Sequence, residues 1–81
     1  MSTDVSIPLT ELPSGTRAVV RRIVGGREIA GRLAAMGVTV NSTLEMLQNP
    51  PHGPLLVRVR NTRLALGHGE AGKILVEKVE A

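Results

Sequence analysis

The 81-residue chain has no aromatic side chain and no cysteine, and this absence limits its fold more than any motif does. A core without Phe, Tyr or Trp must be assembled from Val, Leu, Ile, Ala and three Met residues. No disulfide can brace it, and a chain of this length buries only ~60% of its unfolded surface. We therefore expect a single domain over residues 1–81, with a thin aliphatic core between residues 7 and 79.

The same absences exclude several classes of function. Proteins that bind single-stranded nucleic acid usually stack bases on aromatic rings, and proline-rich peptides usually dock in aromatic-lined grooves. Thiolate zinc sites, iron–sulfur clusters and cysteine nucleophiles all need thiols. The chain also lacks a phosphate-binding loop, a nucleophile elbow and a His-Glu-x-x-His string. We therefore predict that the protein is not an enzyme.

The start of the chain predicts where the protein works. Residues 1–4 contain no basic segment, and no apolar segment of signal-peptide length follows. The longest apolar runs are only a few residues, far short of the ~20 that span a bilayer. We expect a cytoplasmic protein that meets a membrane only through a partner.

The first third of the chain predicts a lead-in and a strand. Residues 7–15 contain two prolines and end at Ser-Gly, which is typical of a short turn-like segment. Residues 16–24 are rich in β-branched side chains and stop at Gly25-Gly26, which indicates a strand. Arg21 and Arg22 are adjacent, so one of them faces inward unless the strand contains a bulge.

A helix is predicted between residues 27 and 36, where the apolar period changes. Ile29, Leu33 and Met36 recur at the spacing of one helical stripe. Gly37 follows, and glycine often ends a helix because it adopts the left-handed conformation at no cost. We expect this stripe to pack into the core, with the helix over one open end of the sheet.

Residues 43–66 predict three further strands, the last two of which form a hairpin. Residues 43–48 alternate apolar and polar side chains, and residues 55–66 do so on both sides of Asn61-Thr62. A turn at Asn61-Thr62 would place Arg60 opposite Arg63 on the outer face.

A final strand at residues 73–79 brings the expected number to five. Five short strands close most economically into a small barrel, because closure removes the exposed edges. The predicted fold is mainly β: a small five-stranded antiparallel barrel capped by one short α-helix.

Several strings, in this order along the chain, resemble those of the ferrous iron transport protein A (FeoA) family. They are Leu9 to Gly15 (LTELPSG), Arg32 to Val38 (RLAAMGV), Pro54 to Arg60 (PLLVRVR) running into Arg63 to Leu66 (RLAL), and Ile74 to Glu77 (ILVE). The resemblance covers residues 7–79 and departs from the family pattern only in turns, at residues 40–41, 49–53 and 61–62. It implies that the barrel is of the Src-homology-3-like (SH3-like) type.

The resemblance also implies a function. FeoA proteins are cytoplasmic accessory or regulatory proteins of bacterial ferrous iron uptake, and the implied partner is FeoB, a membrane permease with a GTP-binding domain. A similar barrel forms the C-terminal domain of iron-dependent repressors, so a metal-dependent regulatory module is one alternative. A small basic barrel that binds nucleic acid is another, although the missing aromatic rings argue against a nucleic-acid partner. Self-association and the direction of regulation are left open.

The outer face of the hairpin is the best candidate for a partner-binding surface. Leu56, Arg58, Arg60 and Arg63 are predicted to share it, so three guanidinium groups lie beside one leucine. The formal net charge of +3 is compatible with an acidic protein, nucleic acid or anionic lipid as partner. A face that is merely solvated is equally consistent with this pattern, because surface arginines are common.

Candidate metal ligands are few. His68 and Glu70 are two residues apart and could both reach one ion, but two ligands do not complete a tetrahedral site. His52 lies in a different loop, and Asp4 lies near the start of the chain. We expect no required cofactor: His52, His68 and Glu70 are candidates only for a weak Fe²⁺ or Zn²⁺ site, and exposed loop histidines are the simpler interpretation.

Overall fold

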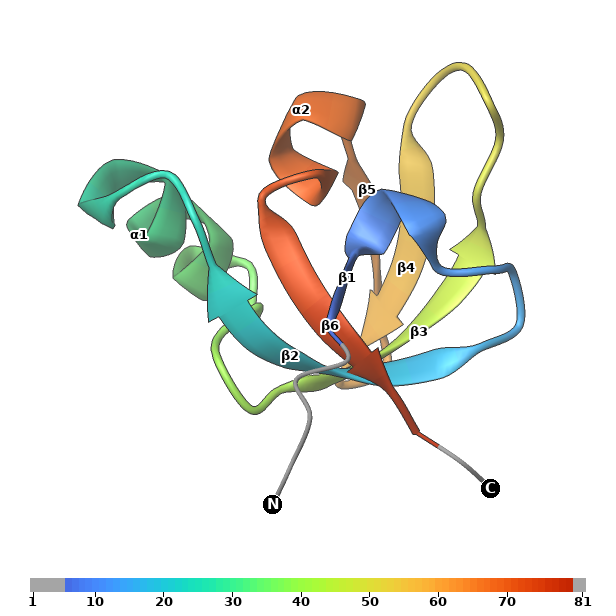
Figure 1. Ribbon diagram of the computed structural model, residues 1–81, viewed down its shortest axis with the longest axis horizontal. Helices are drawn as coiled ribbons and strands as arrows, with labels where there is room; N and C mark the ends of the chain where they lie inside the picture. The colour runs from blue at the N-terminus through green and yellow to red at the C-terminus, as the bar shows by residue number, and fades with distance from the viewer. Residues whose placement is uncertain (1–5, 80–81) are drawn as a thin grey trace.

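The structure is a computed structural model that describes residues 6–79. Within these residues, six strands form one antiparallel sheet in the order β1-β6-β2-β3-β4-β5 (Figure 1). The strands are β1 (Ile7–Pro8), β2 (Arg17–Ile23), β3 (Thr43–Gln48), β4 (Leu55–Val59), β5 (Thr62–Leu66) and β6 (Ile74–Lys78). The helical segments are η1 (Leu9–Glu11), α1 (Arg27–Ala35) and α2 (His68–Ala71).

The predicted mainly-β, SH3-like fold class is confirmed, with one strand more than expected. The expected closure is not complete, because the sheet is open and β1 and β5 are its edge strands. The sequence predicted a turn-like lead-in before β2, and its first two residues pair with β6 as the short edge strand β1. Residues 9–11 of the lead-in form the single turn η1, and residues 14–15 form a turn before β2. The segment between β5 and β6 forms the single turn α2, which lies beside η1 at one end of the curved sheet (Figure 1).

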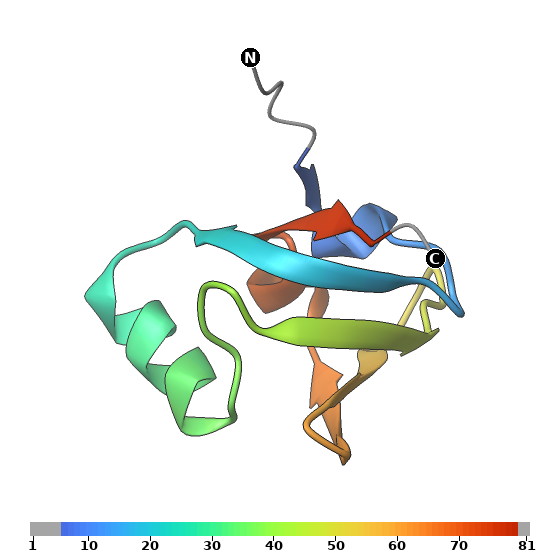
Figure 2. The same cartoon turned by 90° about the horizontal axis from the view of Figure 1, so that it is seen from below.

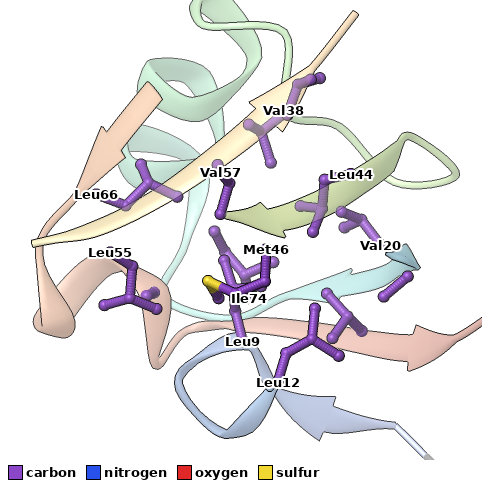
Figure 3. Packing of buried hydrophobic residues seen from close by; sticks show 14 of the residues in the cluster. Leu9, Leu12, Val20, Val38, Leu44, Met46, Leu55, Val57, Leu66 and Ile74 are labelled. Atoms are coloured by element: carbon purple, nitrogen blue, oxygen red, sulfur yellow. The ribbon is translucent and has the colours of Figure 1, made fainter. Parts of the chain in front are cut away.

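The core is aliphatic throughout, as the composition requires. Among the residues that the structure describes, no buried side chain is polar or charged. Met46 and Ile74 lie near the middle of the cluster (Figure 3). The buried residues are Leu9, Leu12, Ala18, Val20, Leu33, Val38, Leu44, Met46, Leu55, Val57, Val59, Leu66, Ala71, Ile74 and Val76.

Helix α1 is attached to this core by the predicted stripe. Leu33 is fully buried, and Ile29 and Met36 are partly buried against the core. Gly37 has a φ of 92°, the left-handed conformation expected at a helix end, and the amide of Val38 donates to the carbonyl oxygen of Leu33 at 2.8 Å. The helix lies beyond the end of β2, beside the sheet (Figure 2).

The β4–β5 hairpin turns one residue earlier than predicted. Arg60 and Asn61 both have positive φ, at 52° and 65°, as in the tight two-residue turn whose twist matches that of the flanking strands. Val59 therefore pairs with Thr62. Thr62 is β-branched and unfavourable at positive φ, so it begins β5 instead of occupying the turn.

This register changes which charges are neighbours. The predicted pairing of Arg60 with Arg63 is wrong, because Arg63 lies opposite Arg58. The shift amounts to two residues in pairing, so every side chain keeps its predicted face while its cross-strand neighbour changes.

Of the two alternatives that the adjacent arginines of β2 left open, an inward-facing arginine or a bulge, the structure has the bulge. The pairing of β2 with β6 shifts between Val20 and Arg22, and the two adjacent arginines, Arg21 and Arg22, are both exposed. The longest helix within residues 6–79 has nine residues, and no helix there is both long and apolar enough to cross a membrane.

Candidate partner-binding face

The four residues predicted to bind a partner lie close together on the hairpin. Leu56 and Arg58 are half-buried in β4, and Arg63 is exposed in β5. Arg58 lies directly opposite Arg63, and Leu56 lies opposite Ala65. Arg60 follows β4 and is exposed in the turn. The structure brings these residues together, and their role in binding stays a prediction.

A row of charged residues continues from the hairpin across two more strands. The registers place Arg63 beside Arg58, Arg58 beside Glu45 of β3, and Glu45 beside Arg17 of β2. Successive side chains of a strand point to opposite faces. The residues next to Arg17, Glu45 and Arg58 in their strands include buried core residues, so these side chains point outward. We call Arg17, Glu45, Arg58, Arg60 and Arg63 together the arginine face.

The arginine face contains one acidic side chain, that of Glu45. Arg58 donates from Nη1 to Oε1 of Glu45 at 3.3 Å, longer than the ~2.8 Å typical of a strong guanidinium–carboxylate bond. Both side chains are partly exposed, at 42% and 32%. In the described part of the chain, no acidic side chain pairs with Arg17, Arg60 or Arg63.

The arginine face accounts for the formal net charge of the whole chain. Its four arginines and one glutamate carry +3, which equals the formal net charge of the chain. The other six basic and six acidic residues cancel. Some of them also pair in space: Arg21 lies 2.8 Å from Glu77, and Arg32 of α1 pairs with Glu70 of α2. Arg22 and Arg27 are further exposed arginines without an ion pair in the described residues, so positive charge also lies outside the arginine face.

Apolar side chains border this row on one side. Leu56 lies two residues before Arg58 in β4 and therefore shares its face. Its partner Ala65 is exposed in β5. Leu47, in the bulge of β3 between the residues that pair with β4, is half-buried. Arginine is enriched at protein–protein interfaces, and burial of the partly exposed aliphatic carbon beside it would favour association.

The candidate metal ligands do not form a cluster. His52 is exposed in the β3–β4 loop, and His68 is exposed at the first position of α2. Glu70 already pairs with Arg32, and Asp4 lies outside the described residues. Within residues 6–79, no group of three or more His, Cys, Asp or Glu side chains is placed to hold a metal ion. Weak metal binding by these residues stays a prediction.

Sequence reasoning missed two members of the arginine face. The alternation of residues 43–48 already indicates that Glu45 points outward. It does not indicate that β3 pairs with β2 on one side and β4 on the other, which places Glu45 between Arg17 and Arg58. Arg17 begins a strand whose sequence carries no signal for its distant neighbours.

The chain matches a known family model and a named relative. A family model described as the FeoA domain matches residues 7–78. A relative from Methanocaldococcus jannaschii that bears the name Fe(2+) transport protein A is 33% identical over 73 residues. That match covers 90% of this chain and 88% of the relative.

Solved structures share the fold. A crystal structure described as iron uptake regulatory protein (FeoA) has a TM-score of 0.85 and 33% identity, and the match covers 93% of this chain and 99% of that one. The solution structure of iron(II) transport protein A from Clostridium thermocellum has a TM-score of 0.83 and 28% identity, and the match covers 90% of this chain and 46% of that one. A manganese-dependent transcriptional repressor has a TM-score of 0.87 and 22% identity, and the match covers 98% of this chain and 45% of the repressor chain. This likeness shows a shared fold alone. The family model and the relatives together show that this chain belongs to the FeoA domain family and has its SH3-like fold.

Proposed function

We propose that this protein is a cytoplasmic accessory protein of ferrous iron uptake, and that it acts by binding the cytoplasmic part of the iron permease FeoB. The names of its relatives, an Fe(2+) transport protein A and an iron uptake regulatory protein, support the link to iron uptake. The observation that carries the proposal is the arginine face beside the apolar side chain of Leu56: within residues 6–79, Arg58 pairs with Glu45, and no acidic side chain pairs with Arg17, Arg60 or Arg63.

The distribution of polar groups supports recognition rather than catalysis. Catalysis generally relies on ionisable groups held in a water-excluded site, where their interactions are strong. In the described residues every ionisable side chain is at least partly exposed, and the interior is entirely apolar. The protein reaches the membrane through its partner and needs no cofactor of its own.

Titration with the permease tests this proposal directly. The purified cytoplasmic part of FeoB from the same organism is titrated with the full chain by isothermal titration calorimetry. We expect saturable binding with a Kd on the order of micromolar, as for a transient regulatory interface. An unrelated acidic protein of similar size is the control, and absence of binding to FeoB at tens of micromolar contradicts the proposal.

A functional readout separates regulation from simple association. In proteoliposomes that contain FeoB, addition of the chain should change the rate of GTP hydrolysis or of Fe²⁺ uptake, and the direction of the change defines it as an activator or an inhibitor. An unchanged rate at saturating concentrations would contradict a regulatory role.

A further inference from the structure

We infer that the arginine face binds a carboxylate-rich segment of a partner protein, and that Glu45 is an internal competitor that occupies Arg58 until the partner's carboxylates replace it. The inference rests on the proposed function for the name of the partner, but not for its chemistry. It follows from the spacing of the cations, from the geometry of the Glu45–Arg58 pair and from the residue types present.

The spacing of the cations favours an anionic ligand. Arg58 and Arg63 lie directly opposite each other, so their Cβ atoms are ~5 Å apart and their like charges are unfavourable. A carboxylate placed between two guanidinium groups removes this repulsion and accepts hydrogen bonds from both. From Arg17 to Arg63 the row crosses three strand spacings, about 14 Å, which an acidic segment lying across the strands can cover.

The geometry of the Glu45–Arg58 pair allows a partner carboxylate to replace Glu45. A guanidinium group has five N–H donors in a planar fork and pairs best with a carboxylate through two parallel bonds. Arg58 uses one donor on Glu45, at 3.3 Å. Arg17 lies on the other side of Glu45 without forming an ion pair to it. A partner carboxylate can therefore take the unused donors of Arg58 and displace Glu45 towards Arg17.

The residue types favour protein carboxylates over phosphates. The cations of the face are all arginines, whereas the two lysines, Lys73 and Lys78, lie elsewhere in the chain. Arginine matches carboxylates bidentately and is enriched at the centres of protein interfaces. The face has no aromatic ring on which a base could stack, and the adjacent Leu56 and Ala65 supply aliphatic surface to a protein partner.

A defined probe tests the chemistry. The full chain is titrated with a fluorescent twelve-residue peptide of alternating Glu and Ala, with single-stranded DNA of equal charge, and with phosphatidylserine vesicles, all near physiological salt. Binding of the peptide with at least about tenfold preference over DNA and vesicles supports the inference, given the geometric match of guanidinium to carboxylate. Equal or tighter binding of DNA or vesicles overturns it.

Paired charge changes locate the site. The double variant Arg17→Glu/Arg63→Glu should weaken peptide binding about tenfold or more, because like charges then face each other across the contact. The control changes the same number of charges elsewhere: Arg22→Glu/Arg27→Glu alters two exposed arginines that have no ion pair within the described chain. Loss of affinity by less than about twofold in the control supports a local site, and an equal loss in both variants overturns it.

The variant Glu45→Gln separates competition from structural support. Removing the internal carboxylate frees Arg58, so the peptide should bind about threefold more tightly, since each screened surface charge contributes only a few tenths to one kcal/mol. A merely structural role for Glu45 predicts unchanged or weaker binding instead. Circular dichroism melting confirms that the variant is folded, and unchanged or weaker binding by the folded variant overturns the role given to Glu45.

The same variants distinguish this inference from the proposed function. If the cytoplasmic part of FeoB binds wild type and the Arg17→Glu/Arg63→Glu variant equally well, the inference fails and the proposed function stands. If the acidic peptide binds through the arginine face but FeoB does not bind at all, the proposed function fails and the inference stands.

Discussion

Helix α1 and the β4–β5 hairpin are held to the same core in different ways. The hairpin is fixed by the backbone ladder between β4 and β5 and by alternate buried residues in β4. Of the arginines on its outer face, only Arg58 forms an ion pair within the described residues, with Glu45. Helix α1 lies beyond the end of β2 (Figure 1), with Leu33 as its one fully buried residue. Its arginine Arg32 is engaged by Glu70 of α2. Arg27, the other arginine of α1, is exposed and has no ion pair within the described residues. The two regions therefore differ in how firmly the backbone is held: β4 buries three of its five residues, and α1 buries one of its nine.

The largest effect is expected at the attachment of α1. Leu33→Ala removes its fully buried anchor and should lower the free energy of unfolding by about 3 kcal/mol, within the range for buried leucine truncations. Chemical denaturation measures the loss. Leu33→Met is the matched control, because a swap of similar volume should cost less than about 1.5 kcal/mol. If Leu33→Ala costs no more than the control, Leu33 is not the anchor.

Replacement of Arg60 in the hairpin turn should weaken binding but not stability, in contrast to Leu33→Ala in α1. Arg60 has a φ of 52°, a conformation that costs ~1 kcal/mol in a residue with a side chain. Arg60→Gly should therefore leave stability unchanged or raise it by up to about 1 kcal/mol. Binding of the acidic peptide should nevertheless weaken about threefold, as one surface charge is lost. Thermal melting and fluorescence anisotropy measure the two effects, and a large loss of stability would contradict the separation of fold from binding.

The ion pair between the helices should contribute little. Arg32 is 61% exposed, so solvent screens its interaction with Glu70, and Arg32→Ala should destabilise the fold by about 0.5 kcal/mol. Repeating the measurement at 1 M salt should abolish the difference between wild type and variant. A loss comparable to that of Leu33→Ala would mean that the pair, rather than the buried leucine, positions α1.

Divalent metal should have the smallest effect. Glu70 is engaged by Arg32 and the two histidines are exposed, so equimolar Fe²⁺ or Zn²⁺ should change the free energy of unfolding by less than about 0.5 kcal/mol, as mass action predicts for a weak site. Melting with and without metal, and with the double variant His52→Ala/His68→Ala, measures it. A rise in Tm that the double variant abolishes would indicate a built site.

The elements with the strongest local signals were the most predictable. The stripe of α1 and its glycine stop and the alternation of β3 all depend on neighbours within a few positions. The error at the hairpin had a local cause as well. The β-branched Thr62 is a local signal against a turn at Asn61-Thr62, but arginine has no marked preference for positive φ that would have indicated Arg60 as the residue sharing the turn with Asn61.

The arginine face could be predicted only in part. Alternation within β4 and β5 places Leu56, Arg58 and Arg63 outward, and the sequence therefore identified the hairpin. The pairing partners of β3 are set by sheet order, which depends on how the whole apolar surface is buried. The sequence could equally not show whether candidate metal ligands in separate loops lie close together, since no local pattern relates His52 to His68.

From the sequence alone follow the aliphatic core, the mainly-β class, the helix and the absence of thiol and aromatic chemistry, because composition and short-range periodicity act within a few residues of the chain. The tertiary structure decided which arginines are neighbours, because it set Arg17 and Glu45 beside the hairpin. The physical reason is that a sheet joins residues distant in sequence through backbone pairing, whose register is selected by burial of the opposite face.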